Sequence, residues 1–317
     1  MSKSVSQSHR GQGIPAGGPI GMFDSGFGGL TVARAVLDLL PQEDLVYIGD
    51  TGRYPYGDKP QSDVRGYARE LAWSLVRDHG AKAVVVACNT AAAALPVADL
   101  QQEFATAGWE IPVVGVIEPG AQSLVRATKS GVVGVIGTIG TIGSGAYSTA
   151  VARASLGARV TLVSASCPGF VEFVERGRIS GDEVTVLAER LLAPIKAAGV
   201  DALLLGCTHY PFLARVISEV MGESVTLVSS ADETAFALRD RLSEGGLLRT
   251  GRPGRHTFLS SGDVAWFREL GTRLLGPELM QADSWQASES IREILADGPD
   301  SRSIPAITTT LSEARPS

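Results

Sequence analysis

Cysteines, aromatic residues and long hydrophobic runs are all scarce in this sequence. It has three cysteines in 317 residues, and aromatic residues make up only 6% of the chain. An odd and small number of cysteines excludes a disulfide framework. With so few aromatic residues, the core must consist mainly of Ala, Val, Leu and Ile. No apolar run approaches the roughly 18 residues that a membrane-spanning helix needs.

An excess of positive charge is also missing. The chain has 28 Lys and Arg against 34 Asp and Glu, which gives a formal net charge of −6. This balance excludes proteins that bind nucleic acids or membrane surfaces through bulk positive charge. The first residues are rich in Ser, Gly and Gln and lack the apolar segment of a signal peptide. We therefore expect a cytoplasmic protein with reduced thiols.

Short runs of Val, Ile and Leu alternate with helical patterns along most of the chain. The runs are nearly continuous, which is typical of parallel strands buried on both faces. A length of 317 residues corresponds to about two domains of roughly 150 residues. We expect an α/β fold of two similar, doubly wound domains with mostly parallel sheets. The predicted strands are 19–23, 45–48, 83–87, 113–116, 132–136, 159–163, 202–205, 225–228 and 257–259, and the predicted helices are 29–40, 61–78, 90–104, 119–128, 184–197, 212–221 and 232–242.

Two segments of the sequence follow the same plan. AVVVACNTAAAALP (83–96) and ALLLGCTHYPFLA (202–214) each have four apolar residues, a small residue, a cysteine, a polar residue and then a helix. Each is preceded by a strand, a loop of small residues and a helix. This repeat predicts two domains related by a pseudo-twofold axis. Because ligands bind beyond the carboxyl ends of parallel strands, the site is expected between the domains.

Cys88 and Cys207 each lie between a predicted strand and the start of a helix. Backbone N–H groups and the helix dipole favour a thiolate at such a position. The alternative is a pair of packed, inert thiols, which are common inside proteins. Cys167 is followed by the turn Pro168-Gly169 and lies outside the repeated plan, so we interpret it as structural.

Several kinds of cysteine chemistry fit this spacing poorly. A zinc site would need closely spaced ligands such as C-x2-C, and a redox pair is usually C-x-x-C. A cysteine hydrolase with one thiol and a distant histidine remains an alternative. Two-base proton transfer fits best, because inverting a carbon centre requires an acid or base on each face. A thiol, with an ordinary pKa of about 8.5, can serve in either form without a cofactor or a metal.

Residues beside the two cysteines extend this hypothesis. Asp24 follows the first predicted strand and could orient or deprotonate Cys88, or could only cap a helix. His209 could assist Cys207 in the same way, or could be a packed imidazole. The loop RYPYGDKP could cover the pocket, or could be an ordinary surface loop. The glycines of GFGG lack the spacing of a nucleotide-binding loop.

Six motifs together resemble glutamate racemases. They are DSGFGG (24–29), YIGDTGRYPYGDK (47–59), VACNTA (86–91), CPGFVEFVE (167–175), LGCTHYPFL (205–213) and SSADETA (229–235). They occur in the family order between about residues 19 and 275. The wider aspartate/glutamate racemase superfamily shares only the two-cysteine plan. The YPYG and CTHYP motifs favour glutamate over aspartate or hydantoin as substrate.

The resemblance implies an isomerase that interconverts L- and D-glutamate without a cofactor and supplies D-glutamate for peptidoglycan. It implies that Cys88 acts on D-glutamate and Cys207 on L-glutamate. Asp24 and His209 would assist these thiols, and Glu175 would be a further acidic group near the second. The implied substrate contacts are Asp24, Ser25, Pro55, Tyr56, Gly57, Asn89, Thr90, Thr138, Thr208 and His209.

The resemblance also implies a domain division. Residues 18–112 together with 227–276 would form the first domain, and residues 113–226 the second. We expect a disordered tail at 1–17 and a poorly ordered tail at 277–317, with one short helix near 290–295. A homodimer is expected. Some members inhibit DNA gyrase, and any such role here would be a protein–protein contact, because the net charge disfavours direct DNA binding. Two alternatives stay open: a racemase for aspartate or another small acid, and a binding or regulatory protein.

Overall fold

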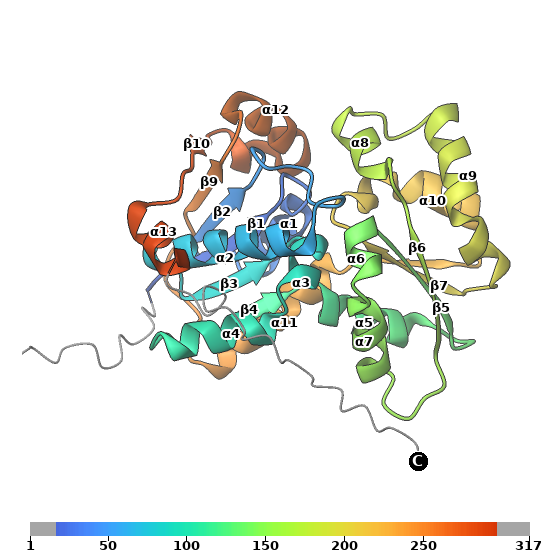
Figure 1. Ribbon diagram of the computed structural model, residues 1–317, viewed down its shortest axis with the longest axis horizontal. Coiled ribbons are helices and arrows are strands. Elements are labelled where there is room, and N and C mark those ends of the chain that lie inside the picture. Colours follow the sequence, from blue (N-terminus) through green and yellow to red (C-terminus); the bar gives the residue numbers. More distant parts are fainter. Residues whose placement is uncertain (1–16, 297–317) are drawn as a thin grey trace, which may run out of the picture.

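Two lobes, each built on its own parallel sheet, make up the part of the chain that the computed structural model describes, residues 17–296 (Figure 1). Most of the predicted tails, residues 1–16 and 297–317, lies outside the described residues. The six strands of the first sheet all pair in parallel. Their spatial order is β10 (Asp283–Ser284), β9 (His256–Ser260), β2 (Leu45–Gly49), β1 (Ile20–Asp24), β3 (Ala83–Val86) and β4 (Val113–Gly115).

The second sheet repeats part of this order. Its four parallel strands are β6 (Thr161–Ser166), β5 (Val132–Gly137), β7 (Ala202–Gly206) and β8 (Thr226–Val228). If the strands of each domain are numbered in chain order, both sheets contain four neighbouring strands in the spatial order 2-1-3-4. Strand β5 is thus equivalent to β1, and β7 to β3. The predicted pair of similar α/β domains with parallel sheets is confirmed, and each cysteine-bearing strand has the same neighbours in its sheet.

Helices cover both faces of each sheet (Figure 1). Helix α2 packs so closely on β1 that a Cβ added at Gly21 would lie 2.9 Å from the Leu75 side chain. Gly134 of β5 is equally close to Ile195 of α9. The first domain contains α1 (Leu30–Leu39), α2 (Gln61–Arg77), α3 (Asn89–Ala94), α4 (Val97–Thr106), α11 (Ala231–Glu244), α12 (Val264–Leu275), η2 (Gly276–Leu279) and α13 (Glu289–Ala296). The second contains α5 (Ile117–Ala127), α6 (Ile139–Gly143), α7 (Ala146–Ala154), α8 (Phe170–Glu175), α9 (Asp182–Ala197), η1 (Tyr210–Leu213) and α10 (Ala214–Met221).

The chain crosses between the sheets slightly later than the predicted division places it. Strand β4, at 113–115, pairs with β3 in the first sheet, and β8, at 226–228, pairs with β7 in the second. The predicted boundary after residue 112 therefore falls one strand early, and the one after residue 226 falls inside β8. The chain then returns to the first sheet, where β9 pairs with β2.

Other differences from the predicted elements have local causes. The single helix predicted at 90–104 is two helices, because Pro96 has no N–H to continue α3 and instead serves as the N-cap of α4. The segment after Gly276 is more regular than expected up to Ala296. Trp285 is buried there and donates a hydrogen bond from Nε1 to Ser74 Oγ at 3.0 Å.

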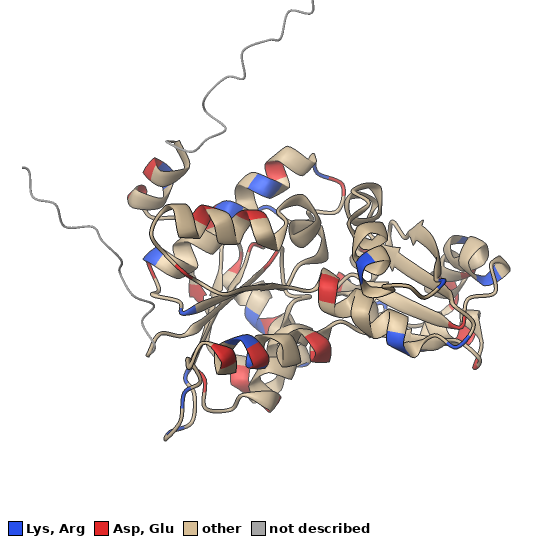
Figure 2. Cartoon of the chain, turned by 90° about the horizontal axis from the view of Figure 1, so that it is seen from below, with Lys and Arg blue, Asp and Glu red and all other residues tan. Residues whose placement is uncertain are grey.

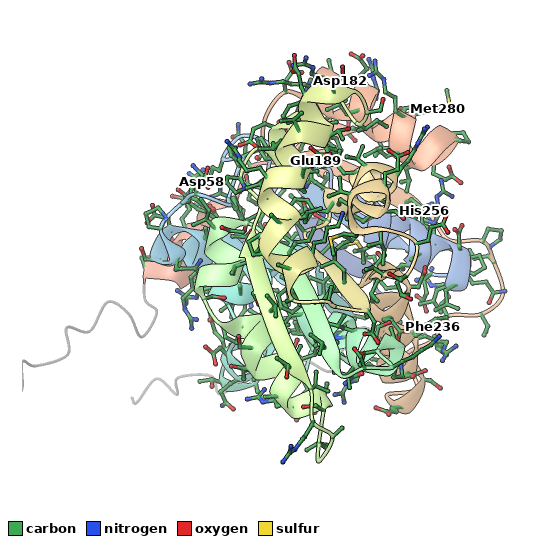
Figure 3. All side chains as sticks on the ribbon, turned by 90° about the vertical axis from the view of Figure 1, so that its right-hand side faces the viewer. Asp58, Asp182, Glu189, Phe236, His256 and Met280 are labelled. Carbon is green, nitrogen blue, oxygen red and sulfur yellow. The ribbon has the colours of Figure 1, made fainter. Side chains whose placement is uncertain are left out.

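Charged residues lie mainly on the helices, with acidic and basic residues interspersed (Figure 2). In α9, for example, Asp182 and Glu189 are exposed on the outside of the second domain, whereas Val184 and Ala188 are buried (Figure 3). Within residues 17–296, no helix combines the length and the apolar character that crossing a membrane requires.

Candidate active site

Cys88 lies where β3 ends and α3 begins. Its Sγ caps the helix by accepting a hydrogen bond from the Ala91 N–H at 3.4 Å, and it donates to Ser25 Oγ at 3.6 Å. Only 4% of the residue is exposed. Burial, followed by the negative charge of Asp24, raises the pKa of the Cys88 thiol to about 12. Cys88 is therefore a thiol that can give a proton.

Cys207 occupies the equivalent place after β7, and a chain of polar contacts leads away from it. Its Sγ lies 3.9 Å from Nδ1 of His209, and Nε2 of His209 lies 3.2 Å from Oε1 of Glu175. Burial acts to lower the pKa of His209, but the hydrogen bonds to Cys207 and Glu175 outweigh it and raise this pKa to about 10. His209 is therefore an imidazolium at neutral pH and places a positive charge beside Cys207.

Asp24 is fully buried at the end of β1 and contacts the second domain. Its Oδ1 accepts a hydrogen bond from the Gly26 N–H at 2.7 Å, and its Oδ2 accepts one from Thr208 Oγ1 at 3.2 Å. Burial raises the pKa of this carboxyl, and the nearby His209 charge opposes the rise. The carboxylate is thus held by Thr208 and Gly26, while the Cys88 thiol bonds to Ser25 instead.

Both cysteines line one cavity between the domains. The loop after each strand end contributes to the wall, as expected for parallel sheets. Asp24, one of the proposed substrate contacts, does not line the cavity. Glu175, the proposed acidic group near Cys207, does not line it either. The other proposed contacts all line the cavity: Ser25, Pro55, Tyr56, Gly57, Asn89, Thr90, Thr138, Thr208 and His209. Tyr54 and Asp58, from the loop predicted to cover the pocket, also line it. Sequence reasoning did not propose the remaining lining residues Ile139, Pro168, Gly169, Val171, Glu172 and Tyr210.

The YPYG loop is held over the cavity from both sides. The buried Asp50, which follows β2, accepts hydrogen bonds from the Tyr56 hydroxyl, from Arg53 Nε at 2.7 Å and from Ser261 Oγ at 2.6 Å. On the other side, the carbonyl of Gly57 accepts a hydrogen bond from the N–H of Gly140 in the second domain at 2.9 Å. The loop is therefore part of the wall between the domains rather than an ordinary surface loop.

A cluster of threonine hydroxyls joins the two domains on the Cys88 side of the cavity. Thr90 Oγ1, in α3, lies 3.0 Å from Thr138 Oγ1 and 3.2 Å from Thr141 Oγ1, both of the second domain. Thr138 also caps α6 by accepting from the Thr141 N–H at 3.1 Å. These contacts fix the relative position of the walls that contribute the two cysteines.

Cys167, which we expected to be only structural, also lines the cavity. Its carbonyl accepts a hydrogen bond from the Tyr210 hydroxyl at 3.1 Å. Burial, with a smaller contribution from negative charge on Cys207, raises the pKa of the Cys167 thiol to about 12. The thiol keeps its proton, and no helix begins at it as one does after Cys88. Its contribution to the site is the shape of the wall.

Gly28 allows the GFGG loop of the first domain to approach the Cys207 side. A Cβ at this position would lie 2.4 Å from Nδ1 of His209 and 2.5 Å from Oγ1 of Thr208. We expect Gly28→Ala to displace His209 from Cys207 and to lower the rate of a reaction catalysed in this cavity by about 100-fold, the effect of a displacement near 1 Å. Steady-state kinetics at saturating substrate measures this loss.

Gly66 provides a matched control for that substitution. It lies exposed inside α2, and a Cβ there would have no atom within 4 Å. Gly66→Ala should leave the rate unchanged and stabilise the fold by about 0.5–1 kcal/mol, because Ala favours a helix interior over Gly. Equal rates for Gly28→Ala and Gly66→Ala would contradict the packing argument.

Comparison with known proteins identifies the family to which this chain belongs. Residues 30–238 match the family model described as Asp/Glu/Hydantoin racemase. A glutamate racemase from Parafrankia sp. (strain EAN1pec) is 52% identical over 266 residues, which cover 83% of this chain and 93% of the relative. A glutamate racemase from Beutenbergia cavernae is 51% identical over 271 residues, covering 82% of this chain and 90% of that protein.

Solved structures agree with the sequence relatives. A glutamate racemase isoform from Bacillus anthracis is 39% identical, covers 86% of this chain and 98% of its own, and has a TM-score of 0.78. A Francisella tularensis glutamate racemase, solved in complex with D-glutamate, is 32% identical, covers 87% of this chain and 99% of its own, and also has a TM-score of 0.78. The chain therefore belongs to the Asp/Glu/Hydantoin racemase family and, as its relatives show, to the glutamate racemases within it, which are isomerases.

Proposed function

We propose that this enzyme interconverts L- and D-glutamate by two-base proton transfer between Cys88 and Cys207, without a cofactor. One observation carries the proposal: two buried thiols, one from each domain, line the same cavity from equivalent strand ends. A substrate held between them would present one face of its Cα to each sulfur. The repeated strand order supports this arrangement, because it brings the two thiols in from opposite domains.

The proposed reaction moves one proton off Cα and another onto it. The thiolate of one cysteine takes the proton, so the Cα–H bond breaks and its electron pair stays on carbon. The second cysteine then gives its S–H proton to the opposite face of Cα and becomes the thiolate. From the family resemblance, Cys207 acts first on L-glutamate and Cys88 acts first on D-glutamate. The resting Cys88 thiol, with its pKa raised to about 12, is in the form needed for L-to-D conversion.

The neighbouring groups have distinct roles in this proposal. His209, positively charged and 3.9 Å from Cys207 Sγ, offsets negative charge on that sulfur and can exchange a proton with it. Glu175 holds the far nitrogen of the ring at 3.2 Å. Asp24 acts through Thr208, to which it is hydrogen-bonded, and through its charge near Cys88. Hydroxyl and amide groups of the cavity wall would bind the two substrate carboxylates.

Glutamate is the proposed substrate because the relatives are glutamate racemases and one related structure contains D-glutamate. Supplying D-glutamate for peptidoglycan is the corresponding proposed role. A racemase for aspartate is the second candidate from the sequence. One methylene in a pocket is worth only about 1–3 kcal/mol of discrimination, so a substrate panel is needed to separate the two. A homodimer and a contact with DNA gyrase stay predictions.

Racemisation in D2O without added cofactor tests the proposal. Starting from L-glutamate, we expect the circular dichroism signal to decay to zero, because the two enantiomers have equal free energy. Mass spectrometry should find one deuterium at Cα of the D-glutamate formed, delivered from a solvent-exchanged thiol. Aspartate in parallel should react more slowly. Inversion without deuterium, or activity only after pyridoxal phosphate is added, would overturn the proposed mechanism.

A further inference from the structure

A buried tyrosine of the second domain contacts the residue that follows Cys88. The Tyr147 hydroxyl, from the start of α7, donates a hydrogen bond to Asn89 Oδ1, at the start of α3, at 2.5 Å. Asn89 lines the cavity and Tyr147 does not. The tyrosine therefore reaches the cavity wall from behind, across the boundary between the domains.

The NH2 group of the Asn89 side chain has no hydrogen-bond partner among the residues that the structure describes. Within residues 17–296, Asn89 Nδ2 is a buried donor without a hydrogen bond, and only 2% of the residue is exposed. Buried N–H groups are rarely left unpaired, and each such case calls for an explanation. Since Asn89 lines the cavity, a carboxylate oxygen of a ligand bound there would supply the missing acceptor.

Two features determine how Tyr147 holds this amide. Gly206, just before Cys207, lets the ring pass, because a Cβ at that position would lie 2.8 Å from Tyr147 Cε2. Burial raises the pKa of the Tyr147 hydroxyl, which thus keeps its proton and must donate it. Among the described residues, Asn89 Oδ1 is the one acceptor this hydroxyl has. A flipped amide would leave the hydroxyl proton unpaired and turn Oδ1 toward an anionic substrate.

We propose that Tyr147 is a positioning residue for substrate binding: it fixes the Asn89 amide so that Nδ2 projects to a carboxylate of the amino-acid substrate. The inference rests on the proposed function for the identity of that substrate. Because Tyr147 and Asn89 belong to different domains, the donor is set only when the domains are in the arrangement seen here. Tyr147 thereby links the approach of the two domains to recognition of the substrate carboxylate.

Tyr147→Phe, which keeps the ring and removes the hydroxyl, tests this role. We expect the KM for glutamate to rise about tenfold while kcat changes by less than about threefold, because one hydrogen bond to a charged group is weakened. Asn89→Ala should raise KM by at least the same factor. In the Asn89→Ala background, Tyr147→Phe should then change KM by less than about twofold, since the group it positions is gone.

The double-mutant comparison separates positioning from general packing. A merely structural tyrosine would raise KM by the same factor in both backgrounds, or would lower kcat and leave KM unchanged, and either result overturns the inference. Thermal unfolding of each variant shows whether the fold is intact. Wild-type protein is measured first: failure to racemise glutamate would overturn the proposed function, and this role for Tyr147 with it, before any variant is compared.

Discussion

Replacing Cys88 or Cys207 by Ala is expected to lower kcat for racemisation by about 10²–10⁴-fold in both directions, the usual contribution of a positioned acid or base. Each thiol serves one face of Cα, and the other thiol cannot reach around the substrate to replace it. Both residues are small and at most 6% exposed, so alanine should preserve the fold. Circular dichroism assays from L- and from D-glutamate measure the loss in each direction.

Cys167→Ala is the matched control for these variants. It removes a third buried thiol from the same cavity wall, but one that follows β6, whereas Cys88 and Cys207 follow the equivalent strands β3 and β7. We expect its kcat to fall far less than that of either proposed catalytic variant. Full turnover by Cys88→Ala or by Cys207→Ala would rule out the two-thiol mechanism, whereas an equal loss in Cys167→Ala would show that packing alone explains the effect.

Lys82→Met is expected to lower the free energy of unfolding by about 3–5 kcal/mol, the effect of breaking a buried ion pair on one side. Lys82 precedes β3 and is completely buried, and its Nζ lies 2.5 Å from Oε2 of the equally buried Glu43. Lys82 Nζ also donates a hydrogen bond to the carbonyl of Leu247 at 2.6 Å, which connects the segment between α11 and β9 to the start of β3. Urea unfolding followed by circular dichroism measures the change.

The double variant Lys82→Met/Glu43→Leu separates the charge from the packing. With both charges removed, no unpaired carboxylate stays buried, and most of the lost stability should return. Racemase activity should be similar in the double variant and the wild type, because Lys82 is at the opposite end of β3 from Cys88. A double variant no more stable than Lys82→Met would contradict the electrostatic explanation.

The sequence predicts the strands well because buried parallel strands consist of continuous apolar runs. All nine predicted strands are present, with ends displaced by at most two residues except at β6, where the run begins at 161 and extends through Ser166. Strand β10 could not be predicted, because two polar residues, Asp283 and Ser284, form it only by pairing with the edge strand β9. The break at Pro96 was visible in the sequence, whereas the packing of Trp285 depends on distant residues.

The candidate site was less predictable in its contacts than in its composition. Their positions at the ends of predicted strands were enough to predict Cys88 and Cys207 as a pair of site residues. They did not show that Asp24 would bond to Thr208 of the other domain, nor that Cys167 would reach the cavity wall. Such contacts depend on how the domains are placed against each other, which no local pattern in the sequence encodes. The Tyr147–Asn89 hydrogen bond is another contact of this kind.

The second domain leaves the first after β4 and returns to it after β8, and the two crossings are adjacent. Arg126 of α5 and Glu233 of α11 form an ion pair at 2.6 Å, and a Cβ at Gly120 would lie 3.1 Å from that of Ser230. In topological terms, the second domain is an insertion whose two ends meet. A small rotation about these adjacent crossings would separate Thr90 from Thr138 and open the cavity, while both sheets stay whole.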